Sequence, residues 1–164
     1  MRRLLFLALM MICLSAMAFG QSLQVVGFVA PGRFSTAGKG EFGFQFGGGV
    51  KYITSTGLGA GAEIALSAPK EGFSSYQAAT ASFNGYYAFK LPAETVESFL
   101  TGGYTRTFLN RMGGDWGNFG GGVTVWSTQS IGFLTEFRGH FRKFQANQEG
   151  ADKMWVIRIG VVAR

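Results

Sequence analysis

The segment from Asn118 to Arg142 alternates in character from one residue to the next over two runs joined by four polar residues, Ser127 to Ser130. A period of two is typical of a β-strand, and the short Ser/Thr/Gln link predicts a hairpin. In the second run one face carries Ile131, Phe133, Thr135, Phe137 and Phe141, and the opposite face carries Glu136, Arg138 and His140. An apolar face of this kind meets either the core of a soluble sandwich or the lipid around a membrane barrel.

The same alternation recurs along the chain and predicts eight strands. Besides the two strands of the hairpin, the predicted strands are Gln24–Ala30, Phe42–Ile53, Leu58–Ser67, Gln77–Phe89, Glu97–Phe108 and Met154–Arg164. We expect Pro31-Gly32 to end the first strand and residues 33–40 to form a loop. Short turns alternate with longer loops, which is typical of an eight-stranded antiparallel up-and-down transmembrane β-barrel. The fifth strand stays without a face assignment, because Phe99 and Leu100 are both large and lie on opposite faces.

The first twenty residues are predicted to be a signal peptide. Arg2 and Arg3 form a charged start, Leu4–Leu14 is an apolar run too short to span a membrane, and Ser15–Gly20 is rich in small residues. Residues 21–164 then form one barrel domain, with both termini in the periplasm and four loops outside. We expect it in the outer membrane of a Gram-negative-type bacterium. The single cysteine, Cys13, lies within the signal segment, so we expect neither disulfides nor cysteine metal sites in the mature chain.

The run Asn118–Val123, with its three central glycines, and the following Phe137-Arg138 and His140 resemble the penultimate hairpin of small bacterial outer-membrane β-barrel proteins. The group is the barrel domain shared by outer-membrane protein A and outer-membrane protein X. This resemblance implies outer-membrane lipid and the barrel assembly machinery as partners. One departure is the last residue, because barrels of this group usually end on an aromatic residue and this chain ends on Arg164.

Charged residues on the face opposite to the apolar one are the candidate functional residues. On the predicted phases the lumen receives Lys51, Glu63, Glu136, Arg138 and Arg158, and Glu97 is a further candidate. Unpaired charge in a narrow interior is costly, and an eight-stranded barrel has room for side chains and little else. We therefore predict an ion-pair network that fills the lumen. The alternative is a Glu–Arg gate that admits small ions.

No catalytic, cofactor-binding or metal-binding residues are predicted. The only histidine, His140, has no serine in register on its strand and stands four residues from Glu136, so we expect a histidine at the barrel rim and no enzyme. The runs Gly47–Gly49 and Gly120–Gly122 lack the Lys-Ser/Thr of a phosphate loop, and we expect them to leave room for large neighbours. The basic residues are scattered, which argues against nucleic-acid binding.

Three functions remain open at this point. The first is a non-enzymatic barrel with a structural or surface-interaction role and a side-chain-filled lumen. The second is a narrow porin-like pore for small solutes or ions. The third is a soluble periplasmic barrel of lipocalin type that binds an apolar ligand, and it requires apolar residues inside and polar residues outside.

Overall fold

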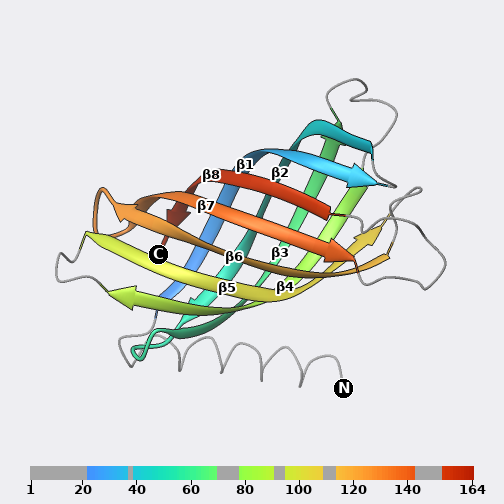
Figure 1. Ribbon diagram of the computed structural model, residues 1–164. Coiled ribbons are helices and arrows are strands. Elements are labelled where there is room, and N and C mark those ends of the chain that lie inside the picture. The colour runs from blue at the N-terminus through green and yellow to red at the C-terminus, as the bar shows by residue number, and fades with distance from the viewer. Residues whose placement is uncertain (1–21, 37–38, 70–77, 91–94, 109–113, 143–152) are drawn as a thin grey trace, which may run out of the picture.

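A computed structural model describes residues 22–36, 39–69, 78–90, 95–108, 114–142 and 153–164. Eight antiparallel strands follow one another around a closed barrel, each paired with its sequence neighbours, and β1 pairs with β8 (Figure 1). The strands are β1 (Ser22–Thr36), β2 (Lys39–Ile53), β3 (Leu58–Pro69), β4 (Ala78–Lys90), β5 (Val96–Phe108), β6 (Gly114–Trp126), β7 (Ile131–Arg142) and β8 (Lys153–Ala163). The predicted fold is confirmed. The predicted signal peptide, residues 1–20, lies outside the described residues.

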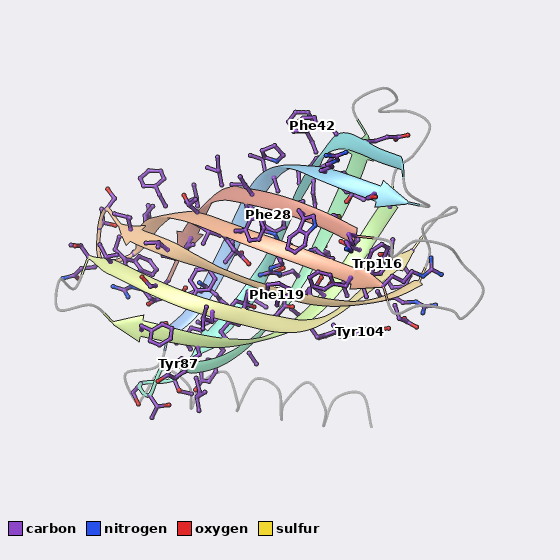
Figure 2. The ribbon with its side chains drawn as sticks, viewed as in Figure 1. Phe28, Phe42, Tyr87, Tyr104, Trp116 and Phe119 are labelled. Atoms are coloured by element: carbon purple, nitrogen blue, oxygen red, sulfur yellow. The ribbon has the colours of Figure 1, made fainter. Side chains whose placement is uncertain are left out.

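The exterior of the barrel is apolar and its interior is polar and charged. Large apolar side chains point outward from every strand, and Ile64 and Phe83 are 72% and 64% exposed. Figure 2 shows Phe42, Tyr87 and Tyr104 projecting from the outer surface. Such an exterior is stable in lipid, where closure also satisfies every strand edge. The lipocalin alternative requires the opposite arrangement, and the structure does not have it.

The first strand is longer than predicted. β1 continues through Pro31-Gly32 to Thr36, so the expected turn there is wrong, and residues 33–36 and 39–40 of the expected loop belong to β1 and β2. Pro31 is accommodated because the β1–β8 ladder passes from Val29–Ile159 to Gly32–Val156 without pairing the two residues between them. A proline is tolerated in a strand where its missing N–H group has no ladder partner to serve.

The structure also settles the phase of β5. Phe99 is 4% exposed and points into the lumen, whereas Leu100 is 57% exposed and faces outward. Glu97 lies on the same inward face as Phe99 and is buried. The fifth strand therefore follows the same alternation as its neighbours, with one aromatic side chain inside.

The turns at one end of the barrel are tight. Gly57 adopts a φ of 87°, which glycine tolerates best, and its N–H group donates to the carbonyl of Thr54. The link after β6 is the predicted one, with the Thr128 hydroxyl accepting from the N–H groups of Ser130 and Ile131. We call this end, which also carries Arg164, the turn end, and the opposite end the loop end. None of the described residues belongs to a helix that is long and apolar enough to cross a membrane.

Candidate functional site: the charged lumen

The strand alternation places all five predicted lumen residues inside the barrel. Lys51 on β2, Glu63 on β3, Glu136 and Arg138 on β7 and Arg158 on β8 are buried. Arg138 is fully buried and Glu63, the most exposed of the five, is only 8% exposed. Charges removed from water to this degree destabilise the fold unless each has a partner.

Two glutamates and two arginines form one cluster across the lumen. Glu63 accepts from both Nη atoms of Arg138, at 2.6 and 3.3 Å, although their strands lie on different sides of the barrel. The same carboxylate accepts from Nη1 of Arg158 at 2.8 Å. Glu136 accepts from Nε of Arg138 at 2.5 Å, and its second oxygen lies 3.7 Å from Nη1 of Arg158. The cluster therefore carries no net charge.

Neutral side chains complete the coordination of this cluster. The Tyr86 hydroxyl donates to Glu63 at 2.8 Å, and the Gln45 carbonyl oxygen accepts from Nη2 of Arg158 at 3.4 Å. The Arg158 guanidinium lies 4.1 Å from the centre of the Phe28 ring. When the Asn84 amide is oriented with its oxygen towards Arg138, that oxygen accepts a hydrogen bond from Nη1 of Arg138 at 3.0 Å. Neutral partners on β1, β2 and β4 thus join charges on β3, β7 and β8.

Lys51 lies apart from this cluster and faces aromatic rings. Its Nζ atom stands 4.6 Å from the centre of the Phe99 ring and 5.7 Å from that of Tyr86. A cation over a ring face is attracted by the ring's negative face, and more strongly where water is excluded. Lys51 crosses the lumen in this way, from β2 towards β4 and β5.

Glycines stand directly opposite four of the buried charges. The ladder pairs are Gly49–Glu63, Gly61–Lys51, Gly122–Glu136 and Gly120–Arg138. At each glycine an added Cβ would lie within about 3 Å of its charged partner: 2.7 Å from Cγ of Glu63, 3.0 Å from Cβ of Lys51, 2.9 Å from Cα of Glu136 and 3.1 Å from Cα of Arg138. The absence of a side chain opposite each charge gives the long side chain space to turn into the lumen.

His140 is not the rim residue that we expected. It is 1% exposed inside the barrel, where its Nδ1 atom lies 3.3 Å from the Thr105 hydroxyl, and its Nε2 atom has no partner among the described residues. The expectation was wrong because the loop-end section of the lumen is itself filled. Thr105 also bonds to Asn118 and Ser82 there, so uncharged polar groups continue above the charged cluster.

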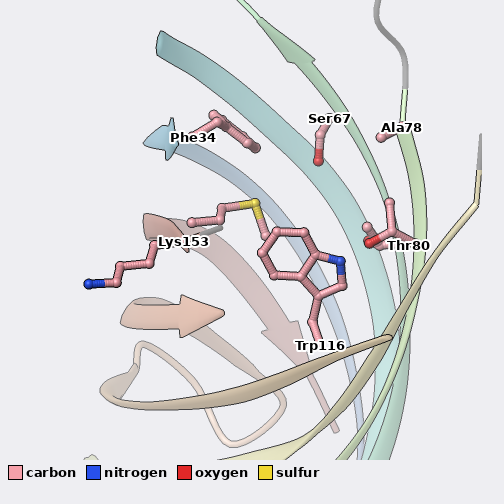
Figure 3. A pocket seen from close by; sticks show the side chains of 8 residues that line it. Phe34, Ser67, Ala78, Thr80, Trp116 and Lys153 are labelled. Atoms are coloured by element: carbon pink, nitrogen blue, oxygen red, sulfur yellow. The ribbon is translucent and has the colours of Figure 1, made fainter. Parts of the chain in front are cut away.

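Both ends of the lumen contain large side chains. Near the loop end a cavity of about 20 Å³ remains, which suits about one water molecule. Its lining includes Phe34, Trp116 and Met154 with the side chains of Ser67, Thr80 and Thr107, and it is almost entirely apolar (Figure 3). Near the turn end Trp126, Leu134 and Val162 are buried, and the Arg164 guanidinium lies 4.0 Å from the centre of the Trp126 ring.

The fold matches solved structures of outer-membrane barrels. Neisserial surface protein A (NspA) aligns with a TM-score of 0.71 at 15% identity, covering 88% of this chain and 98% of that one. The N-terminal β-barrel domain of Pseudomonas aeruginosa OprF gives 0.59 at 12% identity, covering 88% and 98%. The outer membrane enzyme PagL gives 0.51 at 13% identity, covering 85% and 99%. No family model and no curated protein sequence matches.

This chain has the fold of a small outer-membrane β-barrel. The apolar exterior and the closed eight-stranded topology agree with that assignment and with the predicted location in the outer membrane. The aligned structures include an outer membrane enzyme, PagL, and a surface protein, NspA, so the shared fold leaves the activity open.

Sequence reasoning did not identify the neutral partners of the cluster. Gln45, Asn84 and Tyr86 lie on the inward faces of β2 and β4, but nothing in the alternation says which charge each one contacts. Phe28 was not assigned to a face, and the phase of the first strand, with Leu23, Val25 and Val29 outward, now places it inside. Within the described ranges no cluster of His, Cys, Asp and Glu has the arrangement of a metal site.

Proposed function

We propose that this chain is a non-enzymatic outer-membrane barrel whose lumen is sealed by its own side chains and whose role is structural or surface-interacting. The observation that carries this proposal is the neutral cluster of Glu63, Glu136, Arg138 and Arg158 across the middle of the lumen. A pore that conducts ions needs water or weak sites along its axis. Here guanidinium and carboxylate groups bind one another instead.

The side chains above and below the cluster support the same proposal. The loop-end cavity suits about one water molecule, and Trp126 with Leu134 and Val162 fills the turn end. Eight strands enclose an interior that side chains alone can fill, so no separate plug is needed to seal the lumen. We assign the cluster the task of holding β3, β7 and β8 together.

The proposal that the chain is not an enzyme rests on the surroundings of His140. A catalytic imidazole needs a hydroxyl or other nucleophile on one nitrogen and an orienting group on the other. Thr105 lies next to Nδ1, but Nε2 has no partner among the described residues, and the ring is 1% exposed. A lipid substrate on the outer surface would not reach this hydroxyl.

Planar-bilayer recording of the refolded barrel tests the sealed lumen. We expect no steady single-channel steps from the parent protein. We expect steps to appear in Arg138→Ala, because this change opens the centre of the cluster, and not in Arg106→Ala, which removes an arginine from the exterior. Steady steps in the parent protein that vanish or rise in Arg138→Ala would establish a gated pore and overturn the proposal.

A further inference from the structure

Two positively charged residues lie close together on the exterior of the barrel, across the ladder between β1 and β8. Arg33 on β1 and Lys153 on β8 are both exposed, and their ladder partners are Trp155 and Ser35 respectively. Arg33 and Lys153 are therefore diagonal neighbours on one face, a separation that long side chains can bridge. Both stand at the loop end, because Lys153 is the first residue of β8 and Arg33 is three residues from the end of β1.

The Arg33 side chain extends towards β2, on the side of Ser35 that is remote from Lys153. A Cβ added at Gly40 would be 2.5 Å from Nε and 2.8 Å from Nη2 of Arg33, so the guanidinium covers Gly40. Ser35 is directly opposite Gly40 on one side and Lys153 on the other. The Lys153 side chain leads away from the loop-end cavity (Figure 3). A guanidinium, a hydroxyl and an ammonium group thus belong to one row across the exterior of β2, β1 and β8.

The donors of this row are unused. Among the described residues, neither Arg33 nor Lys153 has a carboxylate partner, and the Ser35 hydroxyl forms no hydrogen bond. The row therefore carries two positive charges and no negative one, unlike the Arg106–Asp115 ion pair on the exterior of β5 and β6. A phosphate accepts two parallel hydrogen bonds from a guanidinium fork, and the positive charge favours it over a headgroup without net charge.

Aromatic side chains border this row on the side towards the middle of the barrel. Arg33 is directly opposite Phe42 on β2 and Trp155 on β8. Phe42 meets Phe44 edge-on at 5.3 Å, and Trp155 belongs to a group of packed rings on β6, β7 and β8. Between these rings β1 continues through Pro31, which is directly opposite Phe44. An apolar chain that runs from the charged row along β1 would therefore contact aromatic rings on both sides.

We propose that this surface binds one anionic membrane lipid, with its phosphate at Arg33, Ser35 and Lys153 and an acyl chain along β1 between Phe42 and Trp155. The occupant is a lipid because the three donors adjoin an apolar surface that already faces lipid, whereas a free phosphate would use the donors alone. The inference concerns the exterior and stands whether or not the lumen conducts.

Native mass spectrometry of the refolded barrel in detergent, with added phosphatidylglycerol, tests the headgroup contacts. We expect the parent protein to retain one lipid, and Arg33→Gln and Lys153→Gln each to weaken its apparent affinity about tenfold, since charge-assisted hydrogen bonds contribute on that scale. Arg106→Gln is the matched control, because it removes the same charge from an exposed arginine near the loop end of β5 that already pairs with Asp115. It should retain the lipid as the parent does.

A second pair of variants tests the contact with the acyl chain. Phe42→Ala removes one of the two aromatic borders and should reduce retention, whereas Phe108→Ala removes an equally exposed ring, also 49%, from the loop end of β5 and should not. Heat-modifiable gel mobility verifies that each barrel is folded, and excess inorganic phosphate should leave the lipid bound. Equal losses within either matched pair, equal retention of phosphatidylcholine by the parent protein, or displacement of the lipid by phosphate would overturn the proposal.

Discussion

Gly49 faces Glu63 across the β2–β3 ladder, and a Cβ at Gly49 would lie 2.7 Å from Cγ of Glu63. The same relationship recurs at three further buried charges. The glycine content of this barrel is therefore tied to its charged interior: four of the five charged residues predicted for the lumen have a glycine as a ladder partner, whereas Arg158 pairs with Glu136.

Replacing Gly49 by alanine should destabilise the barrel by about 1–3 kcal/mol, which is the usual cost of overpacking. The added methyl group would also lie 2.3 Å from the carbonyl oxygen of Ala62, which belongs to the backbone and cannot move aside. Urea-induced unfolding in lipid vesicles measures the change. Gly27→Ala, with nothing within 4 Å, should be neutral or slightly stabilising. Equal effects at the two positions would contradict the space argument.

Removing one carboxylate from the cluster should be strongly destabilising. Glu63→Gln removes one of the two carboxylates that Arg138 and Arg158 share, and breaking a buried pair costs about 3–5 kcal/mol. The double variant with Arg138→Met should lose less than the two single variants together, by about 0.5–3 kcal/mol. The same unfolding assay gives the double-mutant cycle. Strict additivity would mean that the two groups do not interact.

Outward positions should respond to charge according to depth. Ile64 is 72% exposed in the middle of β3, and Ile64→Lys should cost about 2–4 kcal/mol because the ammonium enters hydrocarbon. Phe108→Lys, at an outward position that is the last residue of β5 at the loop end, should cost about 0–1 kcal/mol. Folding yields in vesicles report the difference. A similar yield for both variants would speak against a membrane-spanning exterior.

The contact of Arg164 with Trp126 predicts a small effect at the turn end. Arg164 also donates from Nε to the carbonyl of Gln129 at 2.6 Å, so Arg164→Ala removes a hydrogen bond and a cation–π contact. We expect a loss of about 0.5–1 kcal/mol and a change in tryptophan fluorescence. Trp155→Phe identifies the contribution of the exterior tryptophan. An unchanged spectrum of Arg164→Ala in that background would show that Trp126 does not sense Arg164.

Much of this fold follows from a period of two. The sequence patterns of β2, β3, β4, β6, β7 and β8 agree with the observed inward and outward faces, and the predicted extent of β5 agrees with its observed bounds. The alternation is informative because each side chain of a barrel strand points either to lipid or to the lumen. The predicted first strand was too short because Pro31 and Gly32 ordinarily mark a turn. Only the gap in the β1–β8 ladder shows why these two residues remain in a strand. The two faces of β5 were ambiguous because Phe99 and Leu100 are equally apolar.

The lumen was predictable in composition but not in contacts. Alternation alone places Glu63 and Arg138 inside, yet their hydrogen bond requires the register of every strand between β3 and β7. His140 illustrates the same limit, since its burial depends on side chains from β5 and β6 that a single strand does not reveal. Which side chains meet across the lumen of a closed barrel therefore depends on the register of all its strands.

The ion pairs of Glu63 also bear on the order of folding. They join residues 75 and 95 positions apart in the chain, so they form only when β3 has met β7 and β8. A contact absent from the transition state slows unfolding without speeding folding. We therefore expect the loss of Glu63 to speed the unfolding of the finished barrel and to leave the rate of its assembly almost unchanged.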